Sequence, residues 1–109
     1  MKLDILAIAA HPDDAELSCA GALMLHKNLG QKTGILDLTQ GELGSRGSIE
    51  IRATESAKAA EILQLDAREN LQFKDGFFCN DEAHQRKLIS AIRKYQPTIV
   101  LANAPRDRH

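Results

Sequence analysis

The chain has 109 residues, of which 43% are hydrophobic and 27% charged, and its 14 basic and 15 acidic side chains give a net charge of -1. This composition fits one soluble globular domain and excludes a disordered chain. The near balance of charge argues against nucleic acid or an anionic membrane as the main partner, which leaves a small molecule. The first apolar run is too short for a signal peptide or a spanning helix, so we expect a cytoplasmic protein. Cys19 and Cys79 are expected to be reduced thiols.

Apolar runs of strand length alternate with segments of helical periodicity, which is the pattern of βαβ units around a parallel sheet. The predicted strands cover residues 3–9, 33–38, 71–73 and 98–102. The predicted helices cover residues 14–29, 49–64 after Ser48 as N-cap, and a third segment that begins at Asn80 or Asp81 and ends before Pro97. Residues 39–47 carry three glycines among polar residues and are predicted to form a loop. The sequence therefore predicts an α/β fold with a mainly parallel sheet.

Each predicted helix carries an apolar stripe, the pattern of a face that packs on a core. The first stripe comprises Leu17, Gly21, Met24, Leu25 and Leu29. The second comprises Ile49, Ala53, Ala57, Ala60 and Leu63. The third comprises Leu88, Ile92 and Tyr95.

A histidine and two aspartates follow the first strand directly, in the run Ala10-His11-Pro12-Asp13-Asp14. Ligands of open parallel sheets bind beyond the carboxyl ends of the strands, so this turn, the glycine loop and the C-terminal segment with His109 are expected to form one pocket. The spacing of His11 and Asp14 lets an imidazole nitrogen and a carboxylate oxygen reach one zinc ion at about 2.0–2.2 Å. Asp13, beside the ligands, is placed to accept a proton from water on that metal.

The same residues also fit two different roles. Asp13 or Asp14 could serve only as a helix cap, and carboxylates at the end of a first strand also occur in receiver-like phosphoacceptor domains. The segment after the first strand lacks the G-x-G-x-x-G pattern of a dinucleotide-binding fold. His26 and His84 lie within predicted helices, away from the strand ends, and solvent-facing or structural roles are favoured for both.

Two longer motifs resemble a known enzyme family. A-H-P-D-D at 10–14, combined with D-L-T-Q-G-E-L-G-S-R-G at 37–47, resembles the LmbE-like, or PIG-L, family of zinc-dependent N-acetylglucosaminyl deacetylases. Residues 49–52, 68–71, 74–78 and 107–109 resemble, in order, the branch that deacetylates a bacillithiol precursor. The resemblance covers nearly the whole chain and implies a three-layer, Rossmann-like α/β domain.

The resemblance implies roles in catalysis for four residues. His11 and Asp14 match the family's first two zinc ligands, and Asp13 matches the general base that activates water. His109 matches the first histidine of an H-P-D-H motif, which acts as an acid toward the leaving amine or the developing oxyanion. The implied cofactor is Zn²⁺, with Fe²⁺ or cobalt as alternative metals.

The resemblance also implies a substrate and residues that contact it. Arg52 matches an arginine that touches the substrate, and Glu42 and Asp75 match positions that bind sugar hydroxyls. The implied reaction is hydrolysis of the acetamide on a glucosamine ring, and the implied substrate is N-acetylglucosaminyl malate, an amino-sugar conjugate.

The chain departs from the family pattern at its C-terminal end. The third zinc ligand is expected three residues beyond His109, so residues 1–109 are interpreted as the N-terminal part of a single LmbE-like deacetylase domain whose sheet is incomplete at the C-terminus. Such a sheet is expected to expose an edge, which predicts a homo-oligomer. The alternatives are a non-catalytic α/β module that binds a sugar or a metal, and an inactive fragment of the deacetylase.

Overall fold

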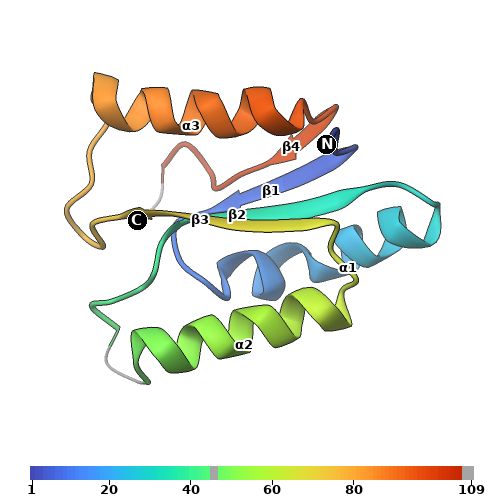
Figure 1. Ribbon diagram of the computed structural model, residues 1–109, viewed down its shortest axis with the longest axis horizontal. Coiled ribbons are helices and arrows are strands. Elements are labelled where there is room, and N and C mark those ends of the chain that lie inside the picture. The colour runs from blue at the N-terminus through green and yellow to red at the C-terminus, as the bar shows by residue number, and fades with distance from the viewer. Residues whose placement is uncertain (45–46, 107–109) are drawn as a thin grey trace.

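The fold is a parallel sheet covered by helices on both faces (Figure 1). A computed structural model describes residues 1–44 and 47–106. The elements are β1 (Ile5–Ala9), α1 (Asp14–Asn28), β2 (Thr33–Thr39), α2 (Ile49–Ile62), β3 (Ala67–Phe73), α3 (Glu82–Tyr95) and β4 (Ile99–Leu101). The strands pair in parallel in the order β3-β2-β1-β4. Helices α1 and α2 lie on one face of the sheet and α3 lies on the other (Figure 1), which confirms the predicted three-layer α/β class.

Two hydrophobic clusters hold the layers together. On the face toward α1, Ile5 and Ile35 of the sheet belong to the same cluster as Leu23 of the helix. On the face toward α3, the cluster includes Leu6 and Tyr95. Burial on both faces explains the continuous apolar run of β1, and each large side chain that is fully buried contributes about 1.5–3 kcal/mol.

Strand β3 begins at Ala67, four residues before the predicted start at Leu71. Three of the four missed residues are polar, and each of those three side chains has a partner. Arg68 pairs with acidic groups of other elements, Glu69 accepts a hydrogen bond from the Tyr95 hydroxyl at 2.9 Å, and Asn70 donates one to the Thr39 carbonyl at 2.7 Å. Long-range hydrogen bonds therefore support this part of the strand, whereas an apolar pattern detects only hydrophobic burial.

The predicted apolar stripe of α1 is wrong as the buried face. Leu17 is 87% exposed, and Met24, Leu25 and Leu29 are also exposed. The buried residues of α1 are Ala15 and Leu23. The helix is apolar on more than one side, and its backbone departs from helical angles at Cys19 (φ -140°, ψ 19°), which breaks the regular period on which the stripe depends.

The stripe predicted for α2 is also largely uncovered. All residues of α2 are described and none of them is buried, although the following Leu63 is. A cavity of about 520 Å³ lies between this helix and residues of β2 and β3, and Ala53, Ala57 and Ala60 line it. In contrast, the α3 stripe faces the sheet as predicted, since Tyr95 is buried and Leu88 packs against the core.

Strand β4 lies at one edge of the sheet formed by the described residues. Ile99 and Val100 of this strand are 40% and 43% exposed. Among the described residues, no helix has the length and apolarity needed to cross a membrane. Cys19 and Cys79 are free thiols, as predicted.

Candidate metal and active site

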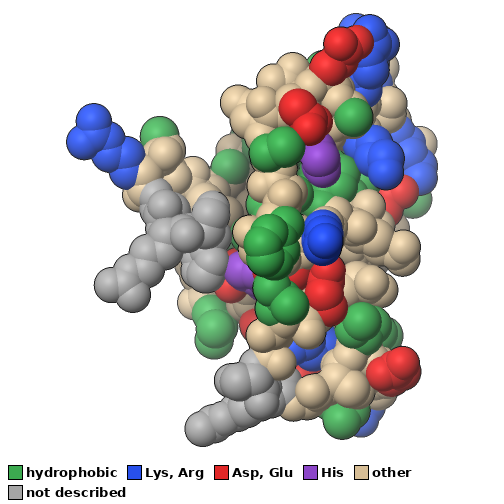
Figure 2. All heavy atoms as spheres, turned by 90° about the vertical axis from the view of Figure 1, so that its left-hand side faces the viewer, with side chains coloured by type: hydrophobic (Ala, Val, Ile, Leu, Met, Phe, Trp, Pro, Cys, Tyr) green, Lys and Arg blue, Asp and Glu red, His purple; other side chains and the backbone are tan. Residues whose placement is uncertain are grey.

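The carboxyl ends of β1 and β2 are joined tightly where the site begins. The backbone N–H and the hydroxyl of Thr39 both donate to the Ala10 carbonyl, at 3.0 and 2.8 Å. This junction sets the turn after β1 beside the glycine loop after β2. A cavity of about 430 Å³ opens there, lined by His11, Pro12, Asp13, Asp14, Gly41, Leu43, Gly44, Arg52 and Asp75. Figure 2 looks onto this edge of the molecule, where histidine and acidic side chains lie close together at two places.

His11 and Asp14 lie at the spacing of two ligands of one metal ion. His11 Nδ1 is 3.4 Å from Asp14 Oδ2, and the same oxygen accepts a hydrogen bond from the His11 backbone N–H at 3.1 Å. Two atoms that each lie about 2.0–2.2 Å from a tetrahedral zinc ion are about 3.3–3.6 Å apart. The side chains are 22% and 31% exposed, so an ion and water can reach them. This donor pair fits a divalent metal.

Asp75, from the connection after β3, holds the other nitrogen of the His11 ring. His11 Nε2 lies 2.7 Å from Asp75 Oδ1, and Asp75 Oδ2 accepts from the Leu43 backbone N–H at 3.0 Å. Burial opposes ionisation of Asp75, but the Leu43 N–H, the His11 ring and the Arg52 charge outweigh it, so the pKa of this carboxyl lies below its usual value. A metal-binding histidine is often oriented by a carboxylate on its second nitrogen. Asp75 therefore turns Nδ1 of His11 toward Asp14.

Glu42 supports this arrangement from the glycine loop. Its carboxylate accepts a hydrogen bond from the Asp75 backbone N–H at 2.9 Å. Both oxygens of Asp75 are thus occupied by protein groups, and its side chain is only 8% exposed. The role of Glu42 and Asp75 in binding sugar hydroxyls stays a prediction.

Asp13 occupies the N-cap position of α1 in an unusual backbone conformation. Its φ of 86° and ψ of -26° are left-handed, whereas an ordinary N-cap residue is extended and its side chain accepts a backbone N–H. Within the described part of the chain, Asp13 makes no such capping bond. The left-handed conformation costs a non-glycine residue on the order of 1–2 kcal/mol. The side chain of Asp13 is therefore not explained by helix capping.

Arg52 reaches from α2 across the glycine loop to the wall of the site. At Gly41, whose φ is +65°, an added Cβ would lie 2.5 Å from Arg52 Nη1. A side chain at Gly41 would also be strained by the backbone conformation. The backbone conformation therefore favours glycine there, and the guanidinium of Arg52 lies against it at the wall of the cavity.

Residues 6–109 match the family described as PIG-L: GlcNAc-PI de-N-acetylase. This chain belongs to the PIG-L family. A curated relative, the diacetylchitobiose deacetylase of Thermococcus kodakarensis, is 30% identical over 93% of the chain and 40% of that protein.

Two solved structures show how far the similarity of this PIG-L chain extends. The conserved protein TT1542 from Thermus thermophilus is 48% identical, with a TM-score of 0.92 over 98% of this chain and 49% of that one. GalB, the 4-carboxy-2-hydroxymuconate hydratase from Pseudomonas putida, is 26% identical, with a TM-score of 0.85 over 100% and 50%. The chain thus spans half or less of the length of these relatives.

The structure brings together most of the residues that the PIG-L motifs single out. His11, Asp13, Asp14, Arg52 and Asp75 line one cavity, and Glu42 contacts Asp75 beside it. His109 lies outside the described residues.

An ion-pair cluster that we did not predict joins three elements of the PIG-L fold. Arg68 of β3 lies 2.9 Å from Asp37 and 3.1 Å from Glu16, so it links β2, β3 and α1. Burial raises the pKa of Asp37, and the hydrogen bond and charge of Arg68 offset this only in part. These residues are 31 and 52 positions from Arg68, and no local spacing signals the contact.

Proposed function

We propose that this chain carries the metal-binding half of a hydrolase that removes the acetyl group from an N-acetylglucosamine conjugate. The observation that carries the proposal is the arrangement of three residues after β1. His11 and Asp14 stand at metal-ligand spacing, and Asp13 beside them is held in a left-handed conformation without a capping role. The family and the deacetylase relative support an amide bond as the target.

Each residue has a defined task in the proposed reaction. His11 and Asp14 would hold a divalent metal, which when bound polarises water and the substrate carbonyl. Asp13 accepts a proton from the attacking water, whose oxygen forms a bond to the acetamide carbon. The C–N bond then breaks, the proton passes to the departing nitrogen, and acetate and a free amine are released. His109 is the proposed acid toward that amine.

The finer substrate assignment rests on charge at the site. We propose N-acetylglucosaminyl malate, with Zn²⁺ as the metal and a cytoplasmic location. Arg52 presents a guanidinium to the cavity, and guanidinium groups match the geometry of carboxylates such as those of malate. We also propose that the exposed β4 edge takes part in a homo-oligomer.

The test is acetate release from N-acetylglucosaminyl malate, with bound metal quantified. It compares this chain with a version extended through the expected Pro-Asp-His to the length of its relatives, and with the Asp13→Asn variant of the extended chain. We expect stoichiometric metal and acetate release in the extended chain, and metal without acetate release in the variant. An extended chain that binds metal but never releases acetate would overturn the deacetylase proposal and favour the non-catalytic metal-binding module.

The second candidate reaction is hydration of a carbon–carbon double bond. It is favoured by the 26% identity to a hydratase over the whole of this chain. Both reactions require activated water, so the shared residues do not separate them. Incubation of the extended chain with an unsaturated dicarboxylate decides between the two, because loss of the double bond without acetate release from the amino sugar indicates a hydratase.

A further inference from the structure

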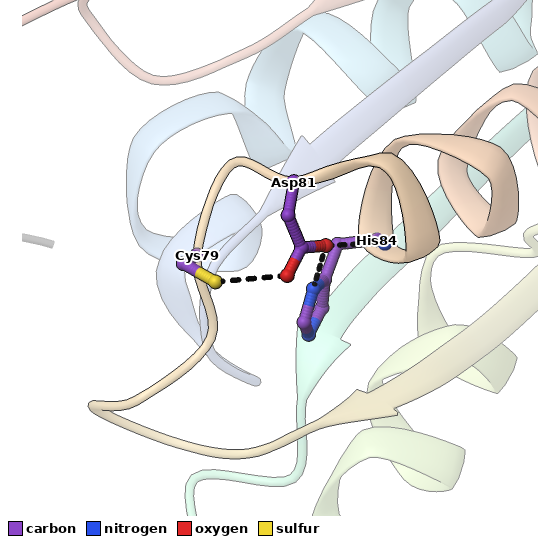
Figure 3. Close-up of side chains that lie close together, drawn as sticks. All are labelled: Cys79, Asp81 and His84. Carbon is purple, nitrogen blue, oxygen red and sulfur yellow. Dashed lines mark hydrogen bonds and ion pairs between the residues drawn. The ribbon is translucent and has the colours of Figure 1, made fainter.

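A second group of potential metal-ligand side chains spans the connection between β3 and α3 and the first turn of α3. It consists of Cys79, Asp81 and His84, and Figure 3 shows the three side chains turned toward one another. Their ligand atoms all lie within 4.8 Å of one another. Cys79 Sγ is 3.0 Å from Asp81 Oδ2, and His84 Nδ1 is 2.6 Å from Asp81 Oδ1. The group lies outside the described linings of the two cavities above.

Two of the three ligands are held in place by the fold. Asp81 is the N-cap of α3, and its Oδ1 accepts the His84 backbone N–H at 3.0 Å. The His84 ring stands edge-on against the buried Phe73 ring, with centroids 4.7 Å apart and an interplanar angle of 79°. This aromatic contact orients the imidazole independently of Asp81. The His84 side chain therefore already has a fixed rotamer before an ion binds.

Helix capping does not account for the whole group. A cap needs one oxygen to accept one N–H, and Asp81 Oδ1 does this alone. The Cys79 thiol and the His84 ring add nothing to the cap, yet both lie against the same carboxylate. One sulfur, one nitrogen and one oxygen donor on a six-residue segment form a mixed ligand set typical of zinc.

We propose that Cys79, Asp81 and His84 bind a divalent cation of the zinc class, separate from the metal of the candidate active site. The 3.0 and 2.6 Å contacts of the Asp81 oxygens are hydrogen-bond distances, so a bound ion replaces both hydrogen bonds and the side chains move apart by a few tenths of an ångström. They then supply three of four tetrahedral positions, and water completes the set. Binding breaks the Cys79 S–H bond, and that proton goes to solvent as the sulfur–metal bond forms. The His84 proton resides on Nε2 when Nδ1 binds the ion. No electron is transferred.

Cobalt(II) added to the 109-residue chain tests the proposal, since a thiolate ligand gives cobalt an intense near-ultraviolet charge-transfer band. His11 and Asp14 offer nitrogen and oxygen only, so cobalt bound by that pair lacks the band. We expect the band in the unmodified chain, its loss in Cys79→Ser and its retention in Cys19→Ser, the matched thiol control. Zinc equilibrium dialysis is expected to show one fewer bound ion in Cys79→Ser than in Cys19→Ser.

The histidine ligand is tested in the same way. His84→Ala is expected to weaken cobalt binding at this site by at least about tenfold, a loss seen even when an outer-shell partner is removed. His26→Ala, on a different helix, is the matched control and should leave the band unchanged. Circular dichroism confirms that each variant is folded. Absence of the band from the folded unmodified chain would overturn the proposal, and so would its persistence in folded Cys79→Ser. Neither result tests the proposed deacetylase activity.

Discussion

Replacing Asp75 by asparagine tests how the site holds its metal ligand. The asparagine side chain has nearly the same shape, but only one of its two polar atoms accepts a hydrogen bond. If its carbonyl keeps the Leu43 N–H, its NH₂ group faces His11 Nε2. The ring can accept a hydrogen bond from that NH₂ group only if Nε2 is unprotonated. The ring proton then sits on Nδ1, the atom 3.4 Å from Asp14. If the amide is reversed, two N–H groups meet at Leu43.

One orientation places the ring proton on Nδ1, the atom that faces Asp14, and the other loses the Leu43 contact. We therefore expect metal affinity to fall about 10- to 100-fold, or roughly 1.4–2.7 kcal/mol. The assay is competition with a metal chelator at neutral pH, in a Cys79→Ser background that leaves one site. NMR of the His11 ring nitrogens reports the tautomer.

Asp66→Asn is the matched control for Asp75→Asn. Asp66 also accepts a backbone N–H, from Thr33 at 2.8 Å, and pairs with Lys27 at 2.9 Å, but it lies before the start of β3, at the opposite end of the strand. We expect this variant to lose stability without losing metal affinity. Wild-type affinity in Asp75→Asn, or an equal loss in both variants, would refute the orienting role of Asp75.

Three further predictions follow from the same contacts. Asp13→Asn should lower acetate release by the extended chain about 10²- to 10⁴-fold with bound metal unchanged, and an active variant would show that another group is the base. Arg68→Met leaves Asp37 buried without its partner, and should lower the free energy of unfolding, measured in urea, by about 3–5 kcal/mol. Adding Asp37→Asn should recover part of this loss. A change near zero in Arg68→Met would contradict the pairing. The pKa of Asp75 is lower in the folded state, so its contribution to stability is present above its ordinary pKa of about 3.9 and disappears as pH falls through the lower folded value. Acid unfolding followed by circular dichroism should therefore depend less steeply on pH in Asp75→Asn than in the unmodified chain, and identical curves would contradict it.

The elements that the sequence predicted well are those governed by local physics. Strands β1 and β2 are apolar because both of their faces are buried, and Ser48 and Asp81 accept the N–H groups of Ile51 and His84 as predicted for caps. The covered face of α1 was not predictable from its stripe, because the helix is apolar on several sides and its backbone departs from helical angles at Cys19.

The local part of the site was also predictable from the sequence, but its long-range contacts were not. His11 and Asp14 are three residues apart, and a turn after a strand is enough to bring them together. The pairing of His11 with Asp75 joins residues 64 positions apart, so only the three-dimensional fold reveals it. Resemblance to a family had pointed to Asp75 as a sugar contact, and the structure adds a contact to the ring of His11, the proposed metal ligand.

The carboxylates at this edge of the sheet have different partners, and the differences favour Asp13 as the proposed general base. Asp37 is paired with its arginine, and both oxygens of Asp75 accept hydrogen bonds. Asp14 lies against His11 Nδ1 and accepts the His11 backbone N–H. Asp13 lines the same cavity without a capping bond, in a conformation that the turn imposes at an energetic cost. A base must be able to take a proton from water, and a carboxylate already committed to a cation or to two donors is a poor acceptor. The same turn that brings the metal-ligand pair together therefore presents the carboxylate best suited to accept that proton.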